Sequence, residues 1–262
     1  MSKTIKEFLY EIDILGFSFF ENIVPVEMLK QISIDIETHQ KKCQQWQRKN
    51  GITDGMEGCA HHIIGQNDSL DDFLNMFFLD EYIRSYFDDG AYILNSYGAL
   101  NNLPYSKDSY KHGHQFHRDV RTYARGFHLM LNMLVMVDDF TVENGATKVI
   151  AGSHQNKERP SDLFIEENTK QVTGLAGSII LFDSNLWHSA APNNTEVSRK
   201  AITPTFTRAF MKQQLDYPRM LGEDYPQNEK MRQLLGYNSR TPSNLDEWYQ
   251  PPEKRMYKAG QG

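Results

Sequence analysis

Apolar positions recur at helical spacing through the first third of the chain. A helix is predicted from Pro25 to about Trp46, because Pro25 suits a first helical turn and leucines and isoleucines follow it at intervals of three and four residues. A second helix is predicted from Ser69 to Phe87, where Asp88-Asp89-Gly90 would end it. We therefore expect residues 1–90 to form a mainly helical part.

From residue 91 onward the pattern changes to short apolar runs between Gly, Asn and Asp turns. Residues 127–137 are apolar on both alternating faces, which indicates a central strand buried on both sides. No helical segment of about 10–15 residues separates the runs, so a β-sandwich or barrel is favoured over a βαβ array. The predicted strands are 91–100, 114–120, 127–137, 148–151, 171–174, 178–182, 186–191 and 200–210.

The last fifty residues are rich in proline, tyrosine and charge. Residues 228–235 are predicted to form a short helix. Residues 241–252 are predicted to form ordered coil that docks through Leu245, Trp248 and Tyr249. No linker is long enough to divide the chain, so we expect a single domain over residues 1–262. It would comprise a helical part (1–90), a β core (91–210) and a C-terminal extension (211–262).

Composition narrows the class of protein. The 262 residues are 39% hydrophobic and 24% charged, which argues against intrinsic disorder, and the net charge of −6 argues against a nucleic-acid partner. Cys43 and Cys59 form neither a disulfide framework nor a zinc pattern, as expected of a reduced cytosolic protein. With no apolar leader and no stretch of about 20 apolar residues, we expect a soluble cytoplasmic protein without membrane contact.

The segment Gln115-Phe116-His117-Arg118-Asp119 carries the most informative chemistry. On a strand, His117 and Asp119 would point to the same face. His188, on another predicted strand, is the candidate for a second imidazole. Two histidines and one carboxylate on one face of a metal leave three adjacent sites open, as in non-heme Fe(II) oxygenases.

Arg199 follows His188 by eleven residues and opens the next predicted strand. A 2-oxo dicarboxylate would chelate the metal at one end and bury its far carboxylate, which a guanidinium fits bidentately. Each residue also has an ordinary interpretation. His117 alone could be a hydrogen-bonded strand histidine, His188 a core histidine and Arg199 a surface residue. The ordered set on a strand-rich background favours the metal interpretation.

These motifs resemble those of the phytanoyl-CoA dioxygenase-like (PhyH) family of Fe(II)/2-oxoglutarate-dependent oxygenases. The resemblance covers roughly residues 8–210. Ala151 stands where the family's Pro-Gly-Ser-His segment has proline, and Ser178 stands where aspartate is common. The matching segments are Gly16-Phe17, 127–139, Glu143-Asn144-Gly145, Ala151-Gly152-Ser153-His154, 177–182, Trp187-His188, Asn193-Asn194-Thr195 and Arg199.

The resemblance implies a mainly β fold with flanking helices around a double-stranded β-helix (jelly-roll, cupin-like) core. It implies that His117, Asp119 and His188 bind Fe(II), and that Arg199 holds the distal carboxylate of 2-oxoglutarate. Asn132 and Leu134 share a strand face and are expected to line the cosubstrate pocket. Ala190 lacks a hydroxyl that some members use for that carboxylate, so a threonine or tyrosine elsewhere would replace it.

Other polar residues surround the motif. Gln115 would share a face with His117, and Arg118, Arg121 and Arg208 would give a positive mouth for an anionic small-molecule substrate. The ordinary interpretation of these arginines is a solvated rim of salt bridges. Two histidine pairs have weaker claims: His112 and His114 would lie near the pocket mouth, and His61 and His62 would face opposite ways with a small chance of touching substrate.

The expected activity is that of an Fe(II)- and 2-oxoglutarate-dependent oxygenase that uses dioxygen. It would hydroxylate an unactivated C–H bond of a small molecule and release succinate and carbon dioxide. Halogenases of this type lack the carboxylate ligand, so Asp119 favours hydroxylation or a related oxidation. Two alternatives stay open: a non-catalytic metal-binding β-helix module, and a cupin-like metalloenzyme that does not use 2-oxoglutarate. The primary substrate and the oligomeric state do not follow from the sequence.

Overall fold

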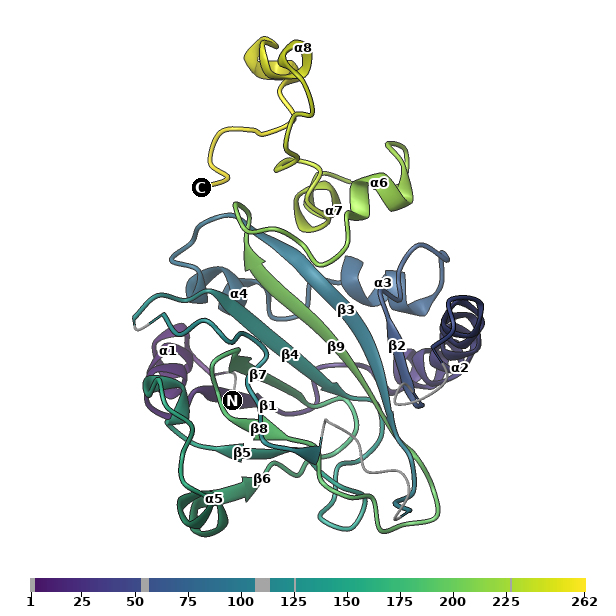
Figure 1. Cartoon of the computed structure of the whole chain (residues 1–262), viewed down its shortest axis with the longest axis vertical. Helices are drawn as coiled ribbons and strands as arrows, with labels where there is room; N and C mark the ends of the chain where they lie inside the picture. The colour runs from purple at the N-terminus through teal and green to yellow at the C-terminus, as the bar shows by residue number, and fades with distance from the viewer. Residues whose placement is uncertain (1–2, 53–56, 107–113, 125, 227) are drawn as a thin grey trace.

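The structure, a computed structural model, describes residues 3–52, 57–106, 114–124, 126–226 and 228–262. Two antiparallel sheets form its centre (Figure 1). In the larger sheet the strands run in the order β1 (Phe17–Phe20), β7 (Ile179–Asp183), β4 (Met130–Met136), β9 (Arg199–Arg208), β3 (Tyr92–Asn102) and β2 (Cys59–His61). In the smaller sheet the order is β6 (Thr169–Gln171), β5 (Lys148–Ile150) and β8 (His188–Ser189).

Strand β4 is buried on both faces, as its apolar pattern predicts. Leu131, Met133 and Val135 point to one side, where they join the core formed with the N-terminal helices. Leu134 and Met136 point to the other side and pack with residues of both sheets. This alternation places one apolar layer beneath the helices and a second layer between the sheets.

Four helices belong to the N-terminal part: α1 (Ile5–Leu15), α2 (Val26–Lys49), α3 (Ser69–Asn75) and α4 (Asp80–Tyr86). Helix α2 matches the prediction and buries its leucine and isoleucine stripe. The prediction of one helix over 69–87 is wrong. Phe77 and Leu79 adopt positive φ angles of 51° and 61°, which a right-handed helix does not accommodate, so the chain turns between α3 and α4. Helix α1 and strand β1 were not predicted.

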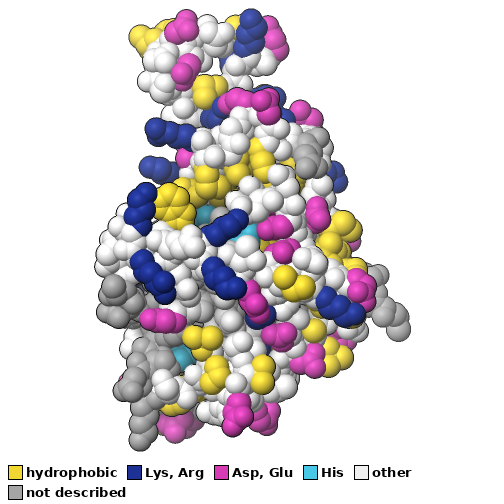
Figure 2. Space-filling view, turned by 90° about the vertical axis from the view of Figure 1, so that its right-hand side faces the viewer, with side chains coloured by type: hydrophobic (Ala, Val, Ile, Leu, Met, Phe, Trp, Pro, Cys, Tyr) yellow, Lys and Arg dark blue, Asp and Glu magenta, His cyan; other side chains and the backbone are white. Residues whose placement is uncertain are grey.

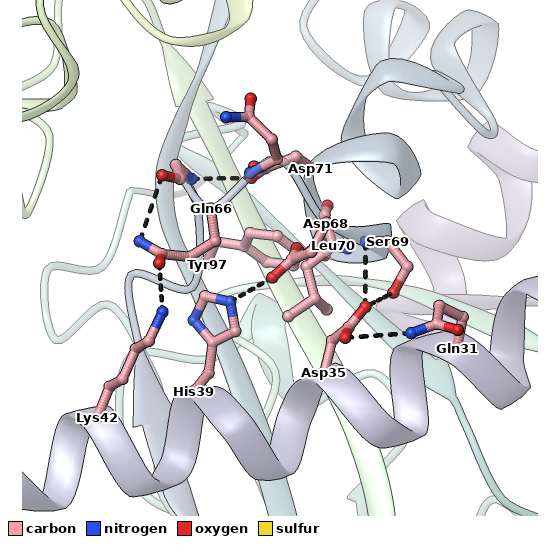
Figure 3. A network of polar contacts seen from close by, with 12 residues as sticks. Gln31, Asp35, His39, Lys42, Gln66, Asp68, Ser69, Leu70, Asp71 and Tyr97 are labelled. Carbon is pink, nitrogen blue, oxygen red and sulfur yellow. Dashed lines mark hydrogen bonds and ion pairs between the residues drawn. The ribbon is translucent and has the colours of Figure 1, made fainter.

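Helices α2 and α3 are joined by a polar network (Figure 3). His39 Nε2 lies 2.8 Å from Asp68, and the Ser69 hydroxyl donates to Asp35 at 2.6 Å. Asp68 also accepts from the Leu70 amide at 3.0 Å and thereby caps the start of α3. This network fixes the connection between β2 and α3, and with it one edge of the larger sheet.

The prediction of a strand at 114–120 is wrong, because only an isolated bridge between His117 and His188 forms there. The other predicted strands appear, several of them shortened or shifted by a few residues. A short helix, α5 (Asp162–Asn168), precedes β6. None of the helices in the described ranges combines the length and apolarity needed to cross a bilayer.

The C-terminal extension forms α6 (Tyr217–Leu221), α7 (Glu229–Leu234) and α8 (Leu245–Trp248). Helix α7 matches the helix predicted at 228–235. The expected docking of Leu245, Trp248 and Tyr249 is wrong, since these side chains are 72%, 62% and 77% exposed. The segment around α8 projects from the body, at the top of Figure 1 and as a narrow knob in Figure 2. Figure 2 also shows acidic and basic side chains interspersed on the face drawn.

Candidate metal centre

His117 and His188 are brought together by their backbones. The His117 amide donates to the His188 carbonyl at 2.9 Å, and the His188 amide donates to the His117 carbonyl at 3.1 Å. The pair forms an antiparallel bridge between β8 and the segment that precedes β4. Their imidazole ring centres consequently lie 4.4 Å apart.

Both imidazoles are oriented by their Nδ1 atoms. His117 Nδ1 lies 2.9 Å from the Gln115 carbonyl, and His188 Nδ1 lies 3.0 Å from the Leu186 carbonyl. A carbonyl only accepts, so each Nδ1 carries a proton, and Nε2 is the nitrogen of each ring that faces the Asp119 carboxylate. This is the arrangement that prepares a histidine to bind a metal through Nε2.

Asp119 completes the set. Its two carboxylate oxygens each lie 3.6 Å from one Nε2 atom, Oδ1 from His117 and Oδ2 from His188. The Asn132 side-chain amide donates to Oδ2 at 2.7 Å and fixes the carboxylate. Burial by itself would raise the pKa of Asp119, but His188, His117 and Asn132 outweigh it and lower that pKa, so the carboxylate is ionised at neutral pH.

The donor set fits Fe(II). One ligand atom from each of the three residues lies within 4.8 Å of the others. Ligands about 2.1 Å from one ion lie ~3 Å apart when adjacent, so small side-chain shifts would close the set on an ion. Two imidazoles and one carboxylate on one face are the donors of the facial triad of non-heme Fe(II) oxygenases.

Arg199 is buried, with 5% of its surface exposed. Its Nη2 donates to the Gly145 carbonyl at 3.1 Å, and its guanidinium carbon lies 3.8 Å from the centre of the Phe140 ring. Burial lowers the pKa of Arg199 to about 10. Within the described residues no carboxylate lies within ion-pair distance of this guanidinium, so it is available to a buried anion.

A cavity of about 410 Å³ joins the His117–Asp119–His188 cluster to Arg199. Asn132 and Leu134 line it from β4, in agreement with the expectation that they share a face. Thr147, which the sequence does not single out, lines the same cavity just before β5, and Ala190 contributes no hydroxyl. Thr147 is therefore one of the threonines in this cavity, with Thr203 and Thr205, that could supply the hydroxyl expected elsewhere in the site.

The four residues expected to contact substrate lie elsewhere. Arg118 donates to the Lys157 and Ser153 carbonyls at 3.0 and 3.3 Å and stacks on Trp187. Because it lies between His117 and Asp119 in the sequence, these contacts attach both candidate ligands to the 153–157 segment. Arg208 donates to the His128 and Phe87 carbonyls and pairs with Asp88. None of the described side chains that line the cavity is Gln115, Arg118, Arg121 or Arg208.

Among the remaining histidines, His61 and His62 face opposite ways as expected. His112 lies outside the described residues. His61 ends β2 and lines the cavity, whereas His62 turns away and contacts the Tyr217 hydroxyl at 2.9 Å. Strand alternation from Arg199 along β9 could have identified two further lining residues, Thr203 and Thr205.

The sequence matches the phytanoyl-CoA dioxygenase (PhyH) family over residues 16–201. An uncharacterized protein of Mycobacterium tuberculosis is 45% identical over 149 residues, which cover 56% of this chain and 55% of that protein. Dioxygenase FUM3 of Gibberella moniliformis is 26% identical over 166 residues, which cover 59% of this chain and 52% of that protein. The chain spans about half the length of the curated relatives it matches.

Solved structures share the fold. The crystal structure of EctD from S. alaskensis with bound Fe aligns with a TM-score of 0.56 and 17% sequence identity, covering 78% of this chain and 77% of that chain. The same protein with 2-oxoglutarate and 5-hydroxyectoine aligns with a TM-score of 0.54 and 18% identity, covering 76% and 74%. The expected mainly β fold with a double-stranded β-helix core and flanking helices is confirmed.

Proposed function

From the premise that the chain belongs to the phytanoyl-CoA dioxygenase (PhyH) family of oxygenases, whose cofactors are Fe(II), 2-oxoglutarate and dioxygen, we propose that it hydroxylates an unactivated C–H bond of a small molecule. Succinate and carbon dioxide would be the coproducts. His117, Asp119 and His188 would bind the iron, and Arg199 would bind the distal carboxylate of 2-oxoglutarate.

The convergence of two Nε2 atoms on one ionised carboxylate carries the proposal. Bound Fe(II) would supply the activation of dioxygen that an unactivated C–H bond requires. The protein's own contribution is orientation. Backbone carbonyls hold the two imidazoles, and Asn132 holds the carboxylate, so that the three residues that would bind the ion are presented together to the cavity.

Arg199 supports the use of a dicarboxylate cosubstrate. A buried guanidinium without an acidic partner costs free energy, and an incoming carboxylate would remove that cost. The Phe140 ring beneath the guanidinium holds it in place, and Leu134 and Phe182 give the cavity apolar walls beside it. These residues would bind one end of 2-oxoglutarate and exclude water from the other.

Asp119 supports hydroxylation over halogenation. A halide would need the position that this carboxylate occupies, and Asn132 holds the carboxylate there. Incubation of the enzyme with chloride and substrate, followed by mass spectrometry, should give oxygenated products without chlorinated ones.

The direct test is an anaerobic titration of the metal-free protein with Fe(II) and then 2-oxoglutarate. We expect a weak visible charge-transfer band that needs both additions and that is absent from His188→Ala. Admission of dioxygen should then release succinate, and a metabolite panel should accelerate that release. A protein that binds Fe(II) but shows no band with 2-oxoglutarate would point instead to a cupin-like metalloenzyme without this cosubstrate.

A further inference from the structure

The cavity continues past the metal ligands into a second region with a distinct lining. Five polar residues line part of this region, beside the apolar Leu100, Met130 and Met133, and we call these five the polar wall. Thr205 is buried, Ser96 and Thr203 are half-buried, and the other two are exposed at the mouth. The polar wall consists of His61 on β2, Ser96 on β3, Thr203 and Thr205 on β9, and Gln214 in the segment after β9.

Strand register makes the polar wall continuous. Ser96 lies opposite Thr205, and Gly98 lies between His61 on one side and Thr203 on the other. A Cβ atom at Gly98 would stand 3.1 Å from the Thr203 hydroxyl and 3.3 Å from the Ala60 carbonyl. Glycine at this position therefore lets the Thr203 side chain and the Ala60 carbonyl approach the β3 backbone closely in the middle of the polar wall.

The hydroxyls of the polar wall are available to a ligand. Thr203 donates to the Gly98 carbonyl at 3.3 Å, but within the described residues the Ser96 and Thr205 hydroxyls make no hydrogen bond to the protein. Each hydroxyl can both donate and accept. A substrate hydroxyl also does both, so the two groups would complement one another.

Charge balance restricts the substrate further. With cosubstrate bound, the charges of Fe(II), Asp119, 2-oxoglutarate and Arg199 would cancel. Beyond the ligand histidines, the described lining residues include no other acidic or strongly basic side chain, and His61 is the remaining titratable one. His61 is exposed overall, but the partial desolvation of its imidazole against the cavity wall lowers its pKa, which favours the neutral form at neutral pH. An ionised substrate group would therefore lose water in this cavity without gaining a residue of opposite charge, which disfavours its binding.

His61 is held in place from behind. Its neighbour His62 adopts a positive φ of 54° and is fixed by the Tyr217 hydroxyl of α6 at 2.9 Å. The two imidazoles thus point to opposite sides of the chain, His61 toward the cavity. The C-terminal extension supplies both Gln214 and the Tyr217 contact, so it helps to build the substrate region.

We propose that the primary substrate is an uncharged, compact molecule bearing several hydroxyl groups, and that Ser96, Thr205 and His61 determine this specificity. The inference rests on the proposed function, because it assigns the second region of the same cavity. The volume of about 410 Å³ must also hold the cosubstrate, which favours a molecule of roughly monosaccharide size within the cavity.

The test compares binding of matched probes to the anaerobic Fe(II)–2-oxoglutarate complex by calorimetry and thermal shift. The panel consists of polyols and methyl glycosides, each with its uronate and its amino counterpart. We expect a neutral member to bind at least about tenfold more tightly than either charged counterpart, a difference of about 1.4 kcal/mol. Binding of a charged counterpart as tightly, or of no neutral member, would overturn the proposal.

Variants make the test specific. Ser96→Ala should weaken binding of the best neutral probe several-fold, and Ser96→Lys should shift preference toward the uronate counterpart. Ser85→Ala is a matched control, because the Ser85 hydroxyl lies outside the cavity lining and donates to the Glu81 carbonyl within α4. Probe binding that is the same in Ser96→Ala and the unsubstituted protein would contradict the assignment. If the unsubstituted protein showed no charge-transfer band with Fe(II) and 2-oxoglutarate, that result would instead contradict the proposed function.

Discussion

His117 and His188 stand 71 residues apart in sequence and exchange both backbone hydrogen bonds, at 2.9 and 3.1 Å. The bridge uses no side-chain atoms, so it sets the spacing of the two imidazoles before any ion binds. The candidate metal centre is thus preformed by the backbone of one bridge, and the Nδ1 contacts orient the two imidazoles.

The first prediction follows from this separation of backbone and side chain. His117→Ala and His188→Ala should each abolish Fe(II) binding and the charge-transfer band, while the bridge persists through main-chain atoms. Isothermal titration would measure Fe(II) affinity, and thermal unfolding of the metal-free proteins would serve as the control. Unchanged Fe(II) affinity in either variant would exclude that residue as a ligand.

The sequence motif predicted correctly that His117 and Asp119 lie together, but it predicted the wrong local structure for the segment that contains them. The prediction that His117 and Asp119 share a side rested on a strand at 114–120, yet only a single bridge forms there. Their proximity comes from the turn between β7 and β8 instead: the Ser184 carbonyl accepts from the Asp119 amide, and the Asn185 side chain donates to the Val120 carbonyl. Contacts of this kind depend on tertiary structure and leave no periodic signal.

A second prediction concerns Asn132, whose amide donates to the Asp119 carboxylate at 2.7 Å. Asn132→Leu keeps a side chain of similar size but removes this donor. We expect Fe(II) affinity to fall about 10- to 100-fold, as is typical when a partner of a metal ligand is lost. Calorimetric titration would measure the change, and Met136→Leu, on the same strand face but outside the cavity lining, is a control. An affinity within twofold of the unsubstituted protein would show that Asp119 needs no such support.

A third prediction assigns Arg118 a structural part. Its guanidinium bonds to carbonyls of the 153–157 segment and stacks on Trp187, so Arg118→Ala should loosen the segment that holds His117 and Asp119. We expect weaker Fe(II) binding by several-fold and a lower unfolding temperature. Arg159→Ala removes an exposed arginine from the adjoining loop and should change neither quantity. If Arg118→Ala instead weakened only substrate binding, the result would support the substrate contact expected from the sequence.

A fourth prediction concerns the cosubstrate. Arg199→Ala should weaken 2-oxoglutarate binding by roughly 30-fold or more, because truncating one partner of a buried ion pair typically costs about 2 kcal/mol or more. Lys200→Ala is the matched control, since Lys200 points to the opposite face and pairs with Glu37. Titration of 2-oxoglutarate followed through the charge-transfer band would give both affinities. Equal affinities in the two variants would remove Arg199 from the cosubstrate site.

The polar wall shows where sequence interpretation stops. Arg199 was singled out by its spacing from His188, and strand alternation leads from it to Thr203 and Thr205, but Ser96 is an ordinary strand residue without a motif. Only the pairing of β3 with β9 places Ser96 beside Thr205, and strand pairing between distant segments cannot be read from periodicity. Periodicity did predict that β4 is central, because a strand buried on both faces must be apolar throughout.

The last prediction is a loss of stability at alkaline pH. Four buried tyrosines, Tyr86, Tyr92, Tyr97 and Tyr217, have pKa values raised above 10, chiefly because burial disfavours the tyrosinate. In the unfolded chain these groups ionise near pH 10, whereas in the folded protein they stay protonated. The protonated tyrosines therefore contribute fully to the unfolding free energy below pH 10, and that contribution is lost as the pH rises above 10. Each such tyrosine removes up to about 1.4 kcal/mol of unfolding free energy per pH unit.

Denaturant unfolding between pH 8 and 12 would test this, with tyrosinate absorbance recorded alongside. We expect the unfolding free energy to fall steeply above pH 10, and the buried tyrosines to ionise together with unfolding; exposed Tyr10 supplies the control position. Tyr97→Phe removes one titrating group and should flatten the slope by one proton, although it also loses the bond to the Leu70 carbonyl. Tyr10→Phe should leave the slope unchanged. A free energy that stays level from pH 9 to 11.5 would mean that these phenols are not protected by the fold, since protection and alkaline instability are two expressions of the same raised pKa.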